Sequence, residues 1–221
     1  MKQVIGVIGG TGKLGAALAR RWLQAGLQVQ IGSRDVSKAA DVAGKLNAEL
    51  GTSAGFGSNA EVADGSDLIV VTVPFAAQAA TLEDIRQQVQ GKIVVDTTVP
   101  LMPPKVMRVQ LPPEGSAALK AQQVLGEGVR LVSAFHSVAA HRLATDEQIR
   151  CDVMVFGDDK AARAEVVKLA DAARLRGIHA GALVNSVAAE ALTSILIFVN
   201  KTYTVDGAGI EFTGELTAPA E

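Results

Sequence analysis

The chain has 221 residues, 48% of them hydrophobic and 20% charged, which is typical of one or two globular domains and excludes a disordered or fibrous protein. A net charge of −2 provides no basic surface, so we expect no nucleic-acid partner. The single cysteine, Cys151, excludes an internal disulfide and a cysteine-rich metal site. No side chains have convincing metal-ligand spacing, and the most apolar run, 188–199, is too short to span a bilayer. We therefore expect a cytoplasmic protein without metal or membrane contact.

Small apolar side chains dominate the composition: 36 alanines and 27 valines stand against six phenylalanines, one tryptophan and one tyrosine. Alanine lets a helix approach a sheet closely, and valine favours strands, so this balance suits helices packed on a valine-rich sheet. Because few aromatic rings are available for stacking, aliphatic side chains and backbone must surround any flat ligand that binds.

Strand-like and helical segments alternate through the first hundred residues. The patterns predict strands over 4–8, 28–31, 68–73 and 92–96, and helices over 12–25, 35–50, 59–63 and 76–89. Alternation at this spacing produces crossover units, and therefore a parallel sheet with helices on both faces. The sequence predicts a Rossmann-type doubly wound α/β fold.

The alternation lapses between residues 97 and 114, where five of the seven prolines lie, and a long irregular segment of this kind is often functional. Beyond it the patterns predict helices over 116–125, 160–175 and 184–203, and strands over 129–134, 153–156 and near 178. We expect a Rossmann domain over residues 1–143, and a small C-terminal α/β domain over residues 144–221.

A glycine-rich turn directly follows the first predicted strand. Gly10, Gly12 and Gly15 have the G-x-G-x-x-G spacing and lie where the first predicted helix begins. One glycine permits a tight turn, one lets a pyrophosphate reach the backbone, and one lets the helix pack closely on the strand. The N–H groups of the helix N-terminus favour phosphate at the same place. This context favours a dinucleotide site over a glycine turn without a ligand.

The end of the second predicted strand distinguishes between the two nicotinamide dinucleotides. Sites for NAD usually carry an acid here to bind the ribose, and this strand ends in Ser33 and Arg34 instead. Arg34 offers a planar set of donors to a phosphate dianion, Ser33 adds a hydroxyl, and Lys38 can reach the same place. Asp35 either caps the following helix, which we favour, or binds the ribose. NADP is therefore the expected cofactor.

Groups that protonate a carbonyl substrate are missing from their usual places. The only tyrosine, Tyr203, is followed four residues later by Gly207, so the Tyr–Lys pair of short-chain dehydrogenases is absent. The stretch 181–186 has no lysine of the kind that hydroxyacid dehydrogenases of the 6-phosphogluconate type use. Hydride exchange between two cofactor-like rings requires a defined position of the rings and the exclusion of water, but no acid. We therefore expect no catalytic side chain.

His136 is the histidine best placed for a site, because it follows a predicted strand at the edge where doubly wound sheets bind ligands. A packing or orienting role is as consistent with that place as proton transfer. We expect His141 and His179 to be surface or structural residues. The pair Asp158–Asp159 precedes a predicted helix and suits capping, and Cys151 suits a small buried filler.

Several motifs recur together in one known family: Gly9–Gly12 with Gly15, and the segments 31–34, 72–75, 95–101, 133–136, 157–159 and 208–210. In these the chain resembles the NADPH-dependent coenzyme F420 reductases (F420:NADP oxidoreductases), over nearly its whole length. Members pass a hydride between NADP and a deazaflavin, so the resemblance implies an NADP-dependent oxidoreductase with coenzyme F420 as co-substrate.

The resemblance also implies roles for individual residues. The pyrophosphate would lie against Gly10, Thr11, Gly12, Lys13 and Leu14, and the 2′-phosphate against Ser33, Arg34 and Lys38. The ribose and nicotinamide would be lined by Val73, Pro74, Val99, Pro100 and Ala140. The deazaflavin ring would be bordered by His136 and Val138, with Gly209 and Ile210 closing over it.

Two alternatives remain open at this point. An NADPH-dependent reductase of a flavin, a ferric chelate or an imine would use the same cofactor site. A non-enzymatic NADP sensor would instead bind partner proteins through the apolar helix 184–203. A large apolar face on that helix needs cover, so we also expect a homodimer or a higher homo-oligomer.

Overall fold

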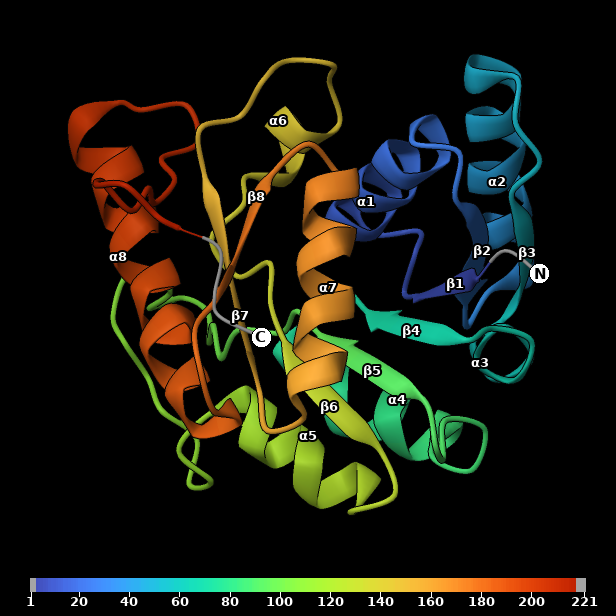
Figure 1. Ribbon diagram of the computed structural model, residues 1–221, viewed down its shortest axis with the longest axis horizontal. Helices are drawn as coiled ribbons and strands as arrows, with labels where there is room; N and C mark the ends of the chain where they lie inside the picture. Colours follow the sequence, from blue (N-terminus) through green and yellow to red (C-terminus); the bar gives the residue numbers. More distant parts are fainter. Residues whose placement is uncertain (1–2, 218–221) are drawn as a thin grey trace.

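An eight-stranded sheet forms the centre of the structure, a computed structural model that describes residues 3–217 (Figure 1). The strand order is β3-β2-β1-β4-β5-β6-β7-β8, and neighbouring strands are parallel except for β6 and β7. The strands are β1 (Val4–Ile8), β2 (Gln28–Ser33), β3 (Gly55–Ser58), β4 (Leu68–Val71), β5 (Ile93–Asp96), β6 (Arg130–Ser133), β7 (Asp152–Gly157) and β8 (Arg176–His179).

Helices cover both faces of this sheet, so the predicted Rossmann-type doubly wound α/β fold is confirmed. One buried cluster packs α1, α2 and α7 on the first face, and a second packs α3, α4 and α5 on the other. The helices are α1 (Lys13–Gln24), α2 (Val36–Leu50), α3 (Asn59–Asp64), α4 (Phe75–Ile85), α5 (Ala117–Leu125), α6 (Ala140–Leu143), α7 (Lys160–Ala172) and α8 (Ser186–Tyr203), which follows a 3-10 turn (Leu183–Asn185).

Two short elements were not predicted from the sequence. Strand β3 contains Gly55 and Gly57, and glycine is a poor strand former, so its sequence lacks the usual pattern. It exists because its backbone pairs with the exposed edge of β2, where Gly57 lies opposite Gly32. Helix α6 is a single turn, which is too short to show a helical period.

Helix α1 contacts residues on both sides of the predicted domain boundary. The Trp22 indole is fully buried and donates a hydrogen bond from Nε1 to the backbone oxygen of Leu169 at 2.9 Å. The buried guanidinium of Arg21 donates to the backbone oxygens of Leu143 and Glu147, each at 2.9 Å, and burial lowers its pKa. One core therefore spans both segments, while the boundary between residues 143 and 144 stays a prediction.

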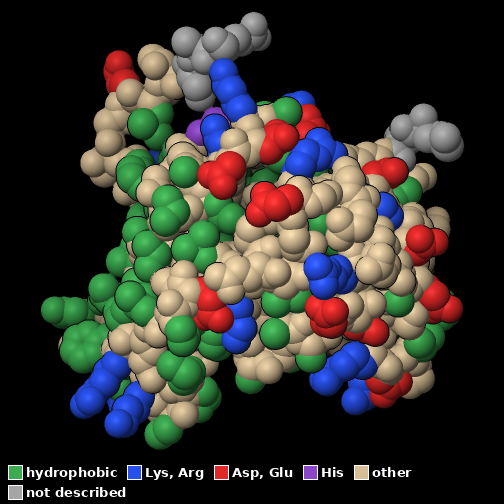
Figure 2. All heavy atoms as spheres, turned by 90° about the horizontal axis from the view of Figure 1, so that it is seen from below, with side chains coloured by type: hydrophobic (Ala, Val, Ile, Leu, Met, Phe, Trp, Pro, Cys, Tyr) green, Lys and Arg blue, Asp and Glu red, His purple; other side chains and the backbone are tan. Residues whose placement is uncertain are grey.

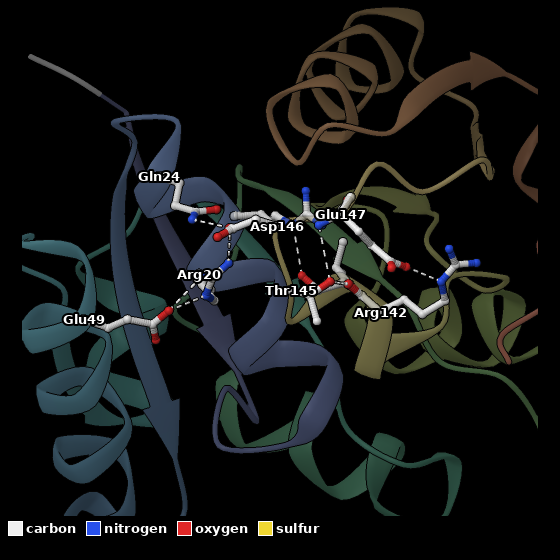
Figure 3. Close-up of polar contacts among 9 residues, drawn as sticks. Arg20, Gln24, Glu49, Arg142, Thr145, Asp146 and Glu147 are labelled. Atoms are coloured by element: carbon white, nitrogen blue, oxygen red, sulfur yellow. Dashed lines mark hydrogen bonds and ion pairs between the residues drawn. The ribbon is translucent and has the colours of Figure 1, made fainter.

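A network of charged side chains joins α1 to α2 and to the segment after α6 (Figure 3). The Arg20 guanidinium lies 2.8 Å from Glu49 and 2.8 Å from Asp146, and Gln24 donates to Asp146 at 2.8 Å. These bonds, that from Arg20 first, hold the pKa of Asp146 well below its usual range. The network thereby holds the turn that carries α6 against α1.

We expect Asp146→Asn to lower the melting temperature at neutral pH, because the variant loses the charge that Arg20 binds. The folded-state pKa of Asp146 is depressed, so its contribution exists above the ordinary value of 3.8 and is lost as the pH falls below it. The difference in melting temperature between the two proteins should therefore shrink on acidification. A difference that grows below that pH would contradict this assignment.

Helix α8 lies at one side of the molecule and packs on α5 (Figure 1). The predicted apolar run 188–199 is part of a longer segment than expected, because Leu183–Tyr203 is long and apolar enough to cross a membrane by length and composition only, a property also found in helices of soluble proteins. Its buried face carries a carboxylate, Glu190, which accepts hydrogen bonds from the backbone N–H groups of Ala117 at 2.6 Å and Ala118 at 3.2 Å. These bonds attach α8 to the N-terminus of α5.

Candidate functional site

The glycine-rich turn between β1 and α1 lies at the carboxyl edge of the sheet. Gly9 has a left-handed φ of 72°, a conformation that glycine adopts without strain. The Gly10 N–H donates to the backbone oxygen of Gly32 at 2.9 Å, and the Gly12 N–H donates to that of Gly9 at 2.9 Å. The turn is therefore tied to the end of β2, so Gly12 and the tip residue Arg34 border one site.

The three glycines of the motif have different reasons to lack a side chain. A Cβ on Gly15 would lie 2.5 Å from Thr72 Oγ1 and 2.8 Å from the Gly10 Cα, and a Cβ on Gly10 would lie 2.9 Å from the backbone oxygen of Val7. Packing of α1 therefore requires the glycine at 15, and the tight turn after β1 requires the one at 10. At Gly12 a Cβ would have one tight contact, 3.3 Å from the backbone oxygen of Gly9, and the next atom would be 3.8 Å away, so the protein leaves more space beside this glycine than beside the other two. That space suits a ligand approaching the backbone.

Helices α1 and α4 begin at this edge without a side-chain cap. Helix α1 begins after Gly12 and has no acid in its first turn, and α4 begins after Pro74. Side chains cap α2, α3, α5 and α7, through Asp35, Ser58, Ser116 and Asp159, while α6 and α8 also begin without a side-chain cap. The uncapped α1 terminus offers N–H groups and a partial positive charge, so the residues present fit a bound phosphate.

A cavity of about 160 Å³ lies between these two helix starts and the tip of β2. It opens beside a trough of about 440 Å³ that runs along α4, and Arg34, Asn59, Ala77 and Thr81 line both. The remaining lining residues of the cavity are Gly9, Thr11, Gly12, Ser33, Thr72, Val73 and Pro74. Six of the predicted cofactor residues therefore share one cavity: Thr11, Gly12, Ser33, Arg34, Val73 and Pro74.

The tip of β2 carries Ser33 and Arg34, and the acid that follows them caps a helix. Asp35 caps α2, accepting from the backbone of Ser37 at 3.1 Å and of Lys38 at 3.4 Å, which confirms the favoured interpretation of this acid. The Ser33 hydroxyl accepts from the Asp35 N–H at 3.1 Å. Within residues 3–217, no hydrogen bond or ion pair engages the exposed guanidinium of Arg34, and the Lys38 ammonium lies 3.6 Å from Asp35.

Other predicted cofactor residues lie outside this cavity. Lys13 and Ala140 line a separate space of about 370 Å³ between α1, α2 and α6. Gly10 is buried in the turn, and Leu14 packs against the core cluster of the first face. Val99 and Pro100 follow β5 at the same edge of the sheet but do not line the cavity.

His136 is buried at the carboxyl end of β6. Its Nε2 lies 2.8 Å from the Ser133 hydroxyl, and its ring centroid lies 6.2 Å from that of Phe156. Its backbone oxygen accepts a hydrogen bond from the Thr193 hydroxyl at 3.0 Å. Burial lowers the pKa of His136 to about 4, so the imidazole is neutral near pH 7. A neutral, hydrogen-bonded ring can orient a ligand but is a poor proton donor at that pH.

The other predicted substrate residues lie near the same end of the sheet. Because β7 runs antiparallel to β6 and begins beyond its end, the residues before Phe156 form a wall past the carboxyl edge. Gly209 packs on this wall, where a Cβ would lie 2.7 Å from the Cβ of Cys151, and the Ile210 oxygen accepts from the Asp152 N–H at 2.6 Å. Cys151 also touches the loop between His136 and Val138, since its thiol donates to the Ser137 oxygen at 3.5 Å.

The remaining candidates have structural places. His141 is exposed and lies 2.7 Å from Asp206, and His179 is a half-buried residue of β8. Of the pair Asp158–Asp159, only Asp159 caps α7 as predicted, accepting from the Ala162 N–H at 2.8 Å, whereas Asp158 accepts from the Leu183 N–H at 3.0 Å. Cys151 is buried, and burial raises the pKa of its thiol, which agrees with a filler.

Two polar residues at this edge, Asn59 and Asp96, were missed by sequence reasoning. Asn59 lines both the cavity and the trough, and its Oδ1 lies 3.5 Å from the Gly9 N–H. Asp96 ends β5 and is fully buried, with a raised pKa caused mainly by desolvation. The position of Asp96, an acid at the end of an apolar strand, was a sequence signal that could have identified it. Asn59 had no such signal, because it reaches the site only through the pairing of β3 with β2.

Comparisons with known proteins support one family. A family model described as "NADP oxidoreductase coenzyme F420-dependent" matches residues 4–100. The F420-dependent NADP reductase of Methanothermobacter thermautotrophicus is 38% identical over 222 residues, covering 96% of each chain. That of Methanocaldococcus jannaschii is 35% identical and covers 95% of this chain and 97% of its own.

The fold is also found in solved structures. A crystal structure from Arthrobacter sp. FB24 superposes with a TM-score of 0.81 at 23% identity, covering 97% of this chain and 100% of that one. A likeness at 23% identity shows the fold alone, whereas the two relatives at 38% and 35% identity show the family. The resemblance seen in the motifs is confirmed, and the chain belongs to the family of F420-dependent NADP reductases.

Proposed function

We propose that this protein is an NADP-dependent oxidoreductase that transfers a hydride directly between NADP(H) and coenzyme F420. The observation that carries the proposal is the 35–38% identity, over at least 95% of the chain, to F420-dependent NADP reductases. The geometry agrees with a dinucleotide of the NADP type, because an uncapped helix start and an arginine border the same cavity.

Each part of NADP has matching residues in this proposal. The pyrophosphate lies at the start of α1 beside Thr11 and Gly12, where no side chain competes for the N–H groups. The 2′-phosphate is bound by Arg34 with Ser33 and Lys38, whereas Asp35 is engaged as a helix cap and accepts no ribose hydroxyl. When bound, the nicotinamide supplies the hydride, and the chain holds and shields it.

The residues proposed around the deazaflavin ring are His136, Val138, Gly209 and Ile210. None of them supplies a proton, because His136 is neutral at neutral pH and the other three have no titratable side chain. Hydride exchange between two rings needs their relative position and the exclusion of water, and aliphatic surroundings provide both.

The test is to mix the protein with NADPH and oxidised coenzyme F420 and to follow the loss of deazaflavin absorbance. We expect turnover with coenzyme F420, and little or none when a flavin, a ferric chelate or an imine replaces it. Tight NADPH binding with no reduction of any acceptor would instead support the NADP sensor.

We also propose that a second copy of the chain covers the exposed face of α8. Large apolar side chains gather on the side of the molecule where α8 lies (Figure 2), and Ile195, Phe198 and Tyr203 are 48%, 51% and 72% exposed. Lys201 is the only charged residue of α8 besides the buried Glu190. An uncharged helix face can pair with its own copy around a two-fold axis.

In sedimentation experiments we expect a dimer or a higher homo-oligomer that Phe198→Glu converts to monomer. Phe56→Glu is the matched control, because Phe56 is equally exposed, at 53%, on the distant strand β3. A wild-type monomer at micromolar concentration would contradict the proposed interface.

We also propose that the boundary between the two domains lies between residues 143 and 144, and that the protein is cytoplasmic. Soluble coenzyme substrates and a buried free cysteine agree with that location.

A further inference from the structure

The carboxylate of Asp96 is fully buried at the end of β5 and is held by three donors. The Thr98 hydroxyl donates to Oδ1 at 2.6 Å, and the Thr98 N–H donates to the same oxygen at 3.3 Å. The side-chain amide of Gln78 donates to Oδ2 at 2.6 Å. Both oxygens of the carboxylate are therefore occupied by groups of this chain.

The three donors come from two segments that border the site. Thr98 belongs to the turn after β5, directly before the proposed nicotinamide residues Val99 and Pro100. Gln78 lies in the first turns of α4, next to Ala77 of the cavity wall. The Gln78 amide also donates to the Ala117 oxygen at 3.0 Å, so the link continues to α5.

Stability alone does not call for an acid at this position. Removing a carboxylate from water costs more than its hydrogen bonds return in many proteins, and an apolar residue of similar volume is often as stable. A second buried acid, Glu190 of α8, raises that cost here through charge repulsion. The carboxylate is instead suited to fixing two segments at a defined distance, because it accepts from both.

We propose that Asp96 is a positioning residue for hydride transfer, which fixes the Thr97–Pro100 turn relative to the first turns of α4. This inference rests on the proposed function. In this proposal Asp96 touches neither coenzyme, and it acts through its hydrogen bonds to Thr98 and Gln78.

The ionisation of Asp96 gives the proposal a measurable pH dependence. Burial, with a smaller contribution from Glu190, raises the pKa of Asp96 to about 7, and His136, which follows the neighbouring strand β6, stays neutral above a pH of about 4. Only the ionised form accepts all three hydrogen bonds, so the positioned state is lost as the pH falls through about 7. The facing groups of α4 and β6, Gln78 and Ser133, do not titrate.

The test compares Asp96→Asn, Thr98→Val and Thr98→Ser with wild type in the NADPH–F420 assay. In Asp96→Asn the new amide N–H faces a donor, and Thr98→Val lacks the hydroxyl that donates to Asp96. Each of these two variants should therefore lower kcat about 10-fold or more. The dissociation constant for NADPH should change less than about 3-fold in both, since the cavity residues are unchanged. Thr98→Ser restores the hydroxyl and should recover most of the rate.

The pH profile separates positioning from a structural role. The ratio of the wild-type rate to the Asp96→Asn rate cancels the pH effects of the coenzymes, and it should rise with pH through about 7. Thr145→Val, which removes an exposed hydroxyl bonded to the Arg142 oxygen, should behave as wild type. If the variants lose melting temperature but keep kcat, or if the ratio is constant with pH, the inference is wrong. If wild type shows no turnover, the proposed function fails first, and this inference fails with it.

Discussion

Arg34→Ala should weaken NADPH binding about 10- to 100-fold and leave NADH binding nearly unchanged. The guanidinium lies at the tip of β2, exposed and unengaged by the residues that the structure describes, beside the cavity that holds Thr11 and Gly12. Hydrogen bonds to a charged group contribute about 1.5–3 kcal/mol, which corresponds to that range of affinity. Only NADPH carries the 2′-phosphate, so only its dissociation constant should change, as measured by fluorescence titration.

Lys38→Ala is the matched control for this result. Its ammonium is exposed and already lies 3.6 Å from Asp35, so we expect a smaller loss of NADPH affinity than for Arg34→Ala. Arg34→Lys should fall between wild type and Arg34→Ala, because an ammonium keeps the charge but not the paired donors. Equal losses of NADPH and NADH affinity in Arg34→Ala would show that this side chain does not recognise the 2′-phosphate.

Gly12→Ala should bind NADPH about 10- to 100-fold more weakly and lose less stability than Gly15→Ala. The backbone at Gly12, with φ −75° and ψ 163°, suits alanine, and a new Cβ would have one tight contact, 3.3 Å from the backbone oxygen of Gly9. We therefore expect the free energy of unfolding to fall by less than the cost of about 1–3 kcal/mol that overpacking carries. The added methyl group would occupy the space through which the pyrophosphate approaches the start of α1.

Gly15→Ala is the partner experiment and should have the opposite profile. Its Cβ would lie 2.5 Å from Thr72 Oγ1 and 2.8 Å from a backbone atom of Gly10, so α1 must move away from the sheet. Overpacking of this kind costs about 1–3 kcal/mol and should be visible in thermal unfolding. A Gly12→Ala protein that unfolds as easily as Gly15→Ala, or that binds NADPH normally, would contradict the division of roles.

The features that could be predicted from the sequence depend on neighbouring residues. The glycine spacing, the basic tip of β2 and the cap formed by Asp35 each lie within a few residues of one strand end. Side-chain direction was harder to predict, and Lys13 and Ala140 line a different space from Thr11 and Gly12. The direction in which Lys13 points depends on the phase of helix α1, and the direction of Ala140 depends on where α6 packs.

Features that depend on distant elements could not be predicted. Asn59 reaches the cavity because β3, a strand with two glycines, adds to the edge of β2 and places the start of α3 there. The contacts around Asp96 join β5 to α4 and, through α5, to Glu190 of α8. No local pattern brings these segments together, because the strand order and the crossovers determine their neighbours.

Direct hydride transfer between the two coenzymes can be followed with an isotope label. NADPH carrying deuterium at the transferable position of the nicotinamide ring is mixed with the protein and oxidised coenzyme F420 in ordinary water. Because no side chain here is assigned to carry a proton or a hydride, we predict that the deuterium appears on the reduced deazaflavin ring. Reduced coenzyme F420 that instead contains hydrogen from the solvent at this ring position would exclude direct transfer.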